Sequence, residues 1–163
     1  LTEMTKVIVG ERSVTWLIHE RPLMEISGFA RIFLSWPSHG MSPFESIIKL
    51  PFEDPETFEH FVRYVYSREV AEMTVLAVLK LYTLAFRLQA PSLCEFILRV
   101  LKQSVSSIEQ SDVQYIMNNI TLSNPLRLRC LIVITNSIFR HEIDPDSLIA
   151  ADIYNKHAIE LLS

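Results

Sequence analysis

Glycine and cysteine are scarce in this chain, and long apolar runs are missing. Its 163 residues include 3 glycines and 2 cysteines, and the apolar stretch that starts at Met73 already ends at Lys80. A membrane helix needs about 20 apolar residues, so the sequence predicts no membrane partner. Phosphate-binding loops need several closely spaced glycines. We therefore expect no nucleotide cofactor.

An excess of positive charge is also missing. The chain has 15 Lys and Arg against 19 Asp and Glu, a net charge of −4, and the basic residues are scattered along it. Proteins that bind a phosphate backbone concentrate positive charge on one face. The sequence therefore predicts that nucleic acid is not a partner.

The two cysteines indicate a compartment. Cys94 and Cys130 each lie in an apolar periodic stretch, where a cysteine behaves as a small buried hydrophobic residue. Reduced thiols of this kind are typical of a reducing environment. We expect an intracellular protein, cytoplasmic, nuclear or both.

Apolar residues, by contrast, are abundant. They make up 49% of the chain, and the mean hydropathy is +0.23. A chain of this size buries roughly 70% of its unfolded surface, so one packed core is expected. The surplus of apolar residues suggests that a partner chain covers part of the surface.

The first 50 residues carry patterns of strands and one helix. Two β-branched or aromatic runs, Val7 to Val9 and Val14 to Ile18, flank a turn and predict a hairpin, and Ser46 to Leu50 is a third strand candidate. Between them, 3.6-residue periodicity predicts a single helix from near Pro22 to before Pro37. Its expected core face consists of Leu23, Ile26, Ala30, Phe33 and Leu34.

Helix-start signals dominate the remainder of the chain. Asp54-Pro55, Asn124-Pro125 and Asp144-Pro145 each combine a capping side chain with proline at the first helical position. Val75 to Leu88 is apolar on nearly every side, which predicts a central, enclosed helix, and further helices are expected from Pro91 and around Ile116. Strands come first and helices follow, so the fold class is α+β.

Catalytic and metal-binding patterns are incomplete. His19-Glu20 and His141-Glu142 begin like a zinc-protease HExxH motif, but Leu23 and Pro145 stand where the second histidine belongs. No serine lies between the two glycines of a hydrolase elbow. The sequence therefore predicts no catalytic residue, no metal ligand and no cofactor, and His19 is expected to have a structural role.

A second apolar stripe is present on the helix after Pro22. Phe29, Ile32 and Trp36 recur at i, i+3 and i+7, roughly 120° from the expected core face. Two explanations stay open. Either the loop from Trp36 to Pro43 or the C-terminal helices cover the stripe, or it is a self-association surface.

Several segments, taken in order, resemble the BTB/POZ family, and their residues are typical of its fungal members. In the first half, a hairpin is followed by a histidine, a leucine, a serine and an aromatic residue, here His19, Leu23, Ser27 and Phe29. The second half also resembles the family, so that the resemblance covers nearly the whole chain. The matching segments of the second half are Leu50 to Phe58, Tyr64 to Ser67, Leu81 to Leu93 and Tyr115 to Arg127. Three positions depart from the family pattern: Glu20, Ala30 and Arg68.

The resemblance implies a BTB/POZ-like fold. A small three-stranded sheet in the N-terminal half is expected to be capped by a cluster of helices, and further helices follow. Residues 1–106 would form the BTB/POZ-like core, and residues 107–163 a C-terminal helical extension packed on the same domain.

The resemblance also implies function. We expect a non-catalytic protein-interaction module that binds a second copy, as a homodimer, or another protein. The self-association residues would be Met24, Phe29, Ile32 and Trp36. An adaptor that brings a cullin scaffold into a ubiquitin ligase is the alternative, with Phe44 and Glu45 facing the cullin. A second alternative, from a different class of function, is a small enzyme with an unfamiliar active site.

Overall fold

The computed structural model describes residues 3–36, 47–103, 110–119 and 124 of the chain. It has an α+β fold, with a three-stranded mixed sheet in the N-terminal half and helices after it. The chain separates into two compact units, Leu1–Ile97 and Leu98–Ser163. No helix in the described part is both long and apolar enough to cross a membrane.

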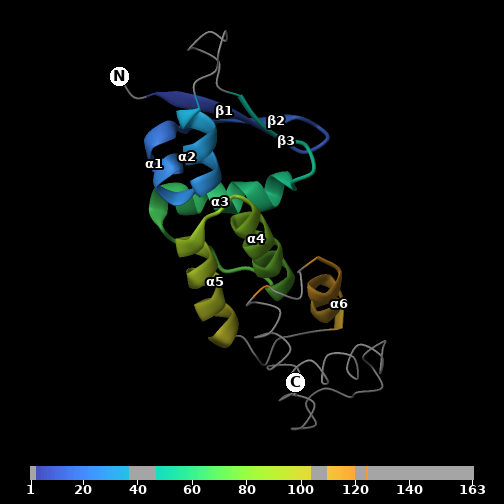
Figure 1. Ribbon diagram of the computed structural model, residues 1–163. Helices are drawn as coiled ribbons and strands as arrows, with labels where there is room; N and C mark the ends of the chain where they lie inside the picture. Colours follow the sequence, from blue (N-terminus) through green and yellow to red (C-terminus); the bar gives the residue numbers. More distant parts are fainter. Residues whose placement is uncertain (1–2, 37–46, 104–109, 120–123, 125–163) are drawn as a thin grey trace. The chain divides into compact units, whose positions relative to one another are not determined.

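The sheet has the strand order β2-β1-β3 (Figure 1). Strands β1 (Met4–Val9) and β2 (Val14–His19) form the predicted antiparallel hairpin. Strand β3 (Ile47–Leu50) pairs with β1 in parallel. β2 ends and β3 begins at the same end of β1, on its two opposite sides, and the segment between them contains helices. The central strand is therefore β1, and β2 lies at an edge.

Side chains alternate between the two faces of this sheet, as the two-residue period of a strand requires. One face carries Val7 and Val9 of β1, Ile18 of β2 and Ile48 of β3, all of them buried. The other face carries Met4 and Leu17, which are exposed. The core of the first unit therefore lies on one side of the sheet.

The single helix predicted after Pro22 is wrong, because the structure has two helices there. They are α1 (Glu20–Ile26) and α2 (Gly28–Ser35), and Ser27 between them has extended backbone angles, φ −106° and ψ 114°. The Ser27 hydroxyl accepts a hydrogen bond from the Ala30 N–H at 3.0 Å and so caps α2. Apolar periodicity continues through this residue, so the pattern alone hid the break.

Helix α3 (Pro55–Ser67) begins as predicted. Asp54 accepts hydrogen bonds from the Thr57 N–H and hydroxyl, both at 2.8 Å, and Pro55 occupies the first helical position. At the other end Arg68 adopts a left-handed conformation, φ 61°, where glycine is the favoured residue. Its guanidinium donates to the Val65 carbonyl at 2.6 Å.

Helix α4 (Val75–Arg87) is the central helix that the sequence predicts. Its buried residues cover most of its circumference: Val78, Leu79, Leu81, Tyr82, Thr83, Leu84 and Ala85. Helix α3 packs against it, and Figure 1 shows α4 below α3. Arg87 at the end of α4 forms a two-pronged ion pair with Glu53, with N–O distances of 2.7 and 2.6 Å.

The remaining described helices are α5 (Pro91–Gln103) and α6 (Gln110–Asn119), both predicted from the sequence. The boundary between the two units falls within α5. In the second unit, Leu101, Asp112 and Ile116 are buried. The helices expected after Asn124 and Asp144 lie outside the described residues, as do Cys130 and most of the 107–163 extension.

Candidate interaction surface

Helix α2 presents large apolar side chains to solvent. Ile32 is 59% exposed, Phe33 42% and Trp36, the C-cap residue, 74%. Positions three and four residues apart share one side of a helix, so these three residues form one patch. We call it the α2 surface. It contains two of the predicted self-association residues, Ile32 and Trp36.

The predicted core position of Phe33 is wrong. The sequence placed Phe33 on the buried face by extending the period of Leu23 and Ile26 through Ser27. The break at Ser27 resets the helical phase, so Ala30 becomes the only buried residue of α2. Leu34 is half-buried. Phe33 therefore adds an aromatic ring to the α2 surface.

Phe29, another predicted self-association residue, lies at the inner margin of this surface. Its side chain is half-buried, and its ring stacks on that of Phe33 with centroids 6.0 Å apart and planes inclined by 24°. It also lines a small cavity together with core residues of the sheet and of α3. Phe29 thus links the exposed patch to the core and supports Phe33 from beneath.

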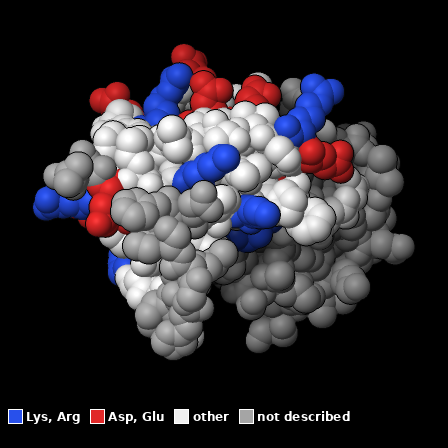
Figure 2. All heavy atoms as spheres, turned by 90° about the horizontal axis from the view of Figure 1, so that it is seen from above, with Lys and Arg blue, Asp and Glu red and all other residues white. Residues whose placement is uncertain are grey.

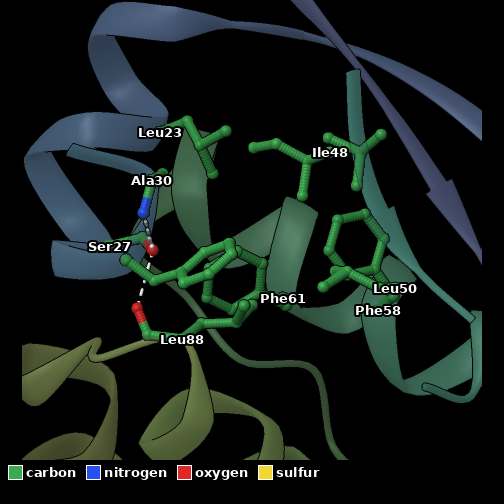
Figure 3. Close-up of a pocket in the computed structure, with 10 residues that line it drawn as sticks. Leu23, Ser27, Ala30, Ile48, Leu50, Phe58, Phe61 and Leu88 are labelled. Atoms are coloured by element: carbon green, nitrogen blue, oxygen red, sulfur yellow. Dashed lines mark hydrogen bonds between the residues drawn. The ribbon is translucent and has the colours of Figure 1, made fainter. Parts of the chain in front are cut away.

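The position of α2 is fixed by the turn between α4 and α5 (Figure 3). The Ser27 hydroxyl donates to the Leu88 carbonyl at 2.6 Å, and the Gly28 N–H donates to the Gln89 carbonyl at 2.8 Å. The Phe29 N–H also donates to Leu88, at 3.3 Å. A Cβ on Gly28 would come within 3.0 Å of the Gln89 side chain. The N-terminus of α2 is therefore hydrogen-bonded to residues about sixty positions later in the chain.

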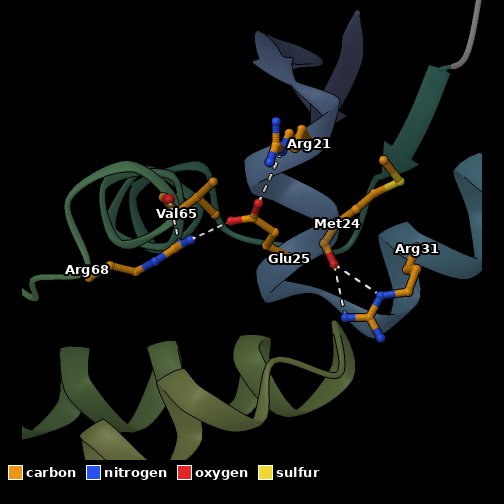
Figure 4. Close-up of polar contacts among 6 residues, drawn as sticks. All are labelled: Arg21, Met24, Glu25, Arg31, Val65 and Arg68. Carbon is orange, nitrogen blue, oxygen red and sulfur yellow. Dashed lines mark hydrogen bonds and ion pairs between the residues drawn. The ribbon is translucent and has the colours of Figure 1, made fainter.

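Met24, the fourth predicted self-association residue, lies on α1 and is half-buried. Its carbonyl accepts two hydrogen bonds from Arg31 of α2, from Nε at 3.2 Å and from Nη2 at 3.0 Å (Figure 4). The last carbonyls of a helix lack partners within the helix, and Arg31 supplies one here. The structure thus places Met24 where α1 and α2 are joined.

A second polar contact in Figure 4 joins α1 to the end of α3. Glu25 lies between Arg21, at 3.4 Å, and Arg68, at 3.3 Å. All three side chains are exposed, so each ion pair contributes at most about 1 kcal/mol. These contacts orient α1, whereas the buried residues stabilise it.

The cavity beside α2 is too small for a substrate. Its volume is about 10 Å³, roughly the room of one water molecule. Its lining is apolar apart from Ser27, whose hydroxyl is already bonded to Leu88 and Ala30. The cavity is therefore a packing gap beneath α2.

Charged groups do not converge on one site in the described part of the chain. No group of three or more His, Cys, Asp or Glu residues there could hold a metal ion. On the face shown in Figure 2, basic and acidic side chains are interspersed. His19 has the structural role predicted for it: its backbone N–H donates to the Tyr66 hydroxyl at 3.0 Å, and its Nδ1 lies 2.9 Å from the same oxygen.

Two side chains have shifted pKa values, and each shift has a local cause. Burial tends to raise the pKa of Asp54, but the hydrogen bonds from Thr57 and the charge of Lys80 outweigh it, so the pKa lies below 3.8. Burial raises the pKa of Cys94 to about 11. The half-buried, free Cys94 is therefore a neutral thiol at physiological pH.

Phe44 and Glu45, which the sequence analysis expected to face a cullin, lie outside the described residues. Two exposed aromatic residues were not predicted. Phe33 is the member of the α2 surface that the sequence reasoning missed, and the serine at position 27, a strong helix N-cap, was the signal of the phase change. Phe52, in the turn after β3, is 97% exposed and was not singled out either.

No protein-family model matches the chain, and no curated protein is similar enough to be identified as a relative.

Proposed function

We propose that this chain is a non-catalytic protein-interaction module of the BTB/POZ kind, and that its α2 surface binds a second copy of the chain. The observation that carries the proposal is the exposure of Ile32, Phe33 and Trp36 on one side of one helix. Aromatic side chains in the desolvated centre of an interface supply most of its binding energy. A patch with two such rings fits that use.

Two further features support the proposal. Helix α2 is fixed at its N-terminus by Ser27 and Gly28 and along its side by Arg31, so the apolar residues are presented in a set geometry. Preorganised groups lose less conformational entropy on binding. The order of elements, a hairpin, two short helices, a third strand and a further helix, is also the order in which the resembling segments occur.

A second copy is the partner that the α2 surface fits best. In a two-fold dimer the same patch contacts itself, so apolar residues meet apolar residues without a charge to pair. Within the α2 surface itself all three side chains are uncharged. Arg31 lies beside them, but its guanidinium is bonded to the Met24 carbonyl. We therefore expect an apolar, self-complementary contact.

The test is the molar mass in solution, measured by light scattering over a range of concentrations. Ile32→Asp combined with Trp36→Ala should convert a dimer into a folded monomer, because a charge in a desolvated apolar contact is strongly penalised. Phe29 is left unchanged because it also lines the cavity beneath α2. Phe52→Ala is the matched control, since it removes an exposed aromatic ring outside the α2 surface and should leave the dimer intact.

Two results would contradict the proposal. One is a wild-type chain that stays monomeric at tens of micromolar, because an interface of standard size binds more tightly than that. The other is a double variant that keeps the dimeric mass. Far-ultraviolet circular dichroism of each variant establishes that the helices are retained.

A further inference from the structure

Strand β2 is an edge strand, and the hydrogen bonds of its neighbours show which of its residues direct their backbone N–H and C=O groups away from the sheet. The Glu20 N–H donates to the Glu3 carbonyl, and the Gly10 N–H donates to the Leu50 carbonyl of β3. Together with the register of the hairpin, these two bonds show which facing pairs are hydrogen-bonded to each other, because bonded and non-bonded pairs alternate in an antiparallel ladder. It follows that Thr15, Leu17 and His19 direct their N–H and C=O groups away from β1.

One end of this outer edge is closed. The outward N–H of His19 is bonded to the Tyr66 hydroxyl, and at the other end Ser13 leaves the strand with a positive φ of 53°. Between them, in the part of the chain that the structure describes, the outward backbone groups of Thr15 and Leu17 form no hydrogen bond. Four polar groups, two N–H and two C=O, are therefore open.

The open edge lacks the usual protection against strand pairing. Natural edge strands carry lysine, proline, a bulge or an inward charge. Strand β2 reads VTWLIH, with no charged residue, proline or glycine, and Leu17 is 65% exposed. A short, uncharged segment rich in β-branched and aromatic residues is the kind that pairs with another strand.

We propose that β2 pairs in antiparallel fashion with β2 of a second copy of the chain, centred on Trp16. In this register Thr15 of each copy lies opposite Leu17 of the other. Both residues direct their N–H and C=O groups outward, so each pair exchanges two hydrogen bonds. Two such pairs give four bonds, which satisfy all the open groups on both copies. The two three-stranded sheets become one sheet of six strands.

Side chains in this register are complementary too. On the inner face Trp16 meets Trp16 of the second copy, and cross-strand aromatic pairs are stabilising. On the outer face Leu17 meets Thr15 of the second copy. The open hydrogen-bonding groups lie symmetrically about Trp16, so a second copy satisfies all of them, and this self-complementary match points to a second copy as the occupant.

This interface is separate from the α2 surface and does not depend on the proposed function. One two-fold interface closes a dimer, whereas two different two-fold interfaces on one chain build tetramers or filaments. A chain that uses both would exceed the mass of a dimer. A strand pair buries less surface than a stable dimer of standard size, so the β2 pairing should be the weaker contact and should respond to concentration.

Amide hydrogen exchange at single-residue resolution tests the pairing directly. In the wild-type chain, the amides of Thr15 and Leu17 should exchange more slowly as the protein concentration rises. Leu17→Lys should abolish this dependence, because a charged edge residue opposes pairing. Met4→Lys is the matched control: it places a charge on the same face but on the central strand, and should keep the dependence.

The outcomes separate this inference from the proposed function. Loss of the concentration dependence in Leu17→Lys but not in Ile32→Asp with Trp36→Ala supports the β2 pairing, whatever the α2 surface does. Fast exchange at every concentration would overturn it. Slow exchange independent of concentration would also overturn it, because this chain's own residues would then cover the edge. Thr15→Pro, which removes one outward donor, replaces Leu17→Lys if that variant fails to fold.

Discussion

Helices α2 and α4 are both rich in apolar residues, yet the structure uses them in opposite ways. Seven residues of α4 are buried, from Val78 to Ala85. In α2 the single buried residue is Ala30, and three large apolar side chains at its end are exposed. The difference shows that the surplus of apolar residues is divided between a core and a surface. High hydropathy alone therefore does not identify which helix is central.

The largest change in the free energy of unfolding is expected for a substitution in the buried helix α4. Leu84 of α4 is fully buried, so Leu84→Ala removes apolar contacts and leaves a cavity. We expect the free energy of unfolding to fall by about 2–5 kcal/mol. Ile32→Ala, on the exposed side of α2, should change it by no more than about 0.5 kcal/mol. Urea denaturation of both variants measures the contrast. Equal losses would remove the distinction between the two helices.

The next largest effect concerns the junction that holds α2 to α4. Ser27 is buried, caps α2 and donates to the Leu88 carbonyl at the end of α4. Ser27→Ala removes both hydrogen bonds and leaves buried polar groups unsatisfied, which should cost about 1–3 kcal/mol. The exposed Ser35 at the end of the same helix is the control, and Ser35→Ala should be nearly neutral. A neutral Ser27→Ala would show that the junction does not position α2.

A smaller effect is expected from the cap of α3, the helix that packs against α4. The pKa of Asp54 is lowered, so the folded chain binds this proton more weakly than the unfolded chain does. The stabilisation by the ionised cap is therefore present above 3.8, the usual pKa. It is lost as the pH falls from there through the lowered pKa of the folded state.

The corresponding variant is Asp54→Asn, compared with the wild type by thermal unfolding at several pH values. Near neutral pH the wild type should be more stable by about 0.3–1 kcal/mol, because asparagine keeps the capping acceptor but lacks the negative charge that is favoured at a helix N-terminus. This advantage should shrink as the pH falls below 3.8 and the carboxyl of the folded chain takes up its proton. An advantage that persists in acid would mean that the charge of Asp54 has no part in the cap.

The sequence predicted well wherever the signal was local. The hairpin, the Asp54-Pro55 start of α3 and the enclosed helix α4 each depend on residues within one turn or one strand, and all three were predicted. The break at Ser27 was missed because the apolar period runs through this residue without interruption. The N-cap serine was a local signal, but the carbonyls of Leu88 and Gln89, which bond to Ser27 and Gly28, lie sixty residues away and leave no periodic trace in the sequence.

The candidate site was predicted in part for the same reason. Ile32 and Trp36 stood out because two apolar stripes cannot both be buried by one short helix. The exposure of Phe33 followed only from the phase change at Ser27. The open edge of β2 required the strand order, in which the third strand inserts beside β1 rather than beside β2, and no pattern within β2 itself encodes that choice.

The central claim is that the α2 surface becomes buried when two copies meet, and Trp36 reports on this most directly. The chain has 2 tryptophans, so Trp16→Phe leaves Trp36 as the single emitting residue. We predict that its fluorescence shifts to shorter wavelength and resists acrylamide quenching as the concentration rises, and that Ile32→Asp prevents both changes. Trp36 emission that remains typical of a solvent-exposed indole, while light scattering shows a dimer, would contradict the account.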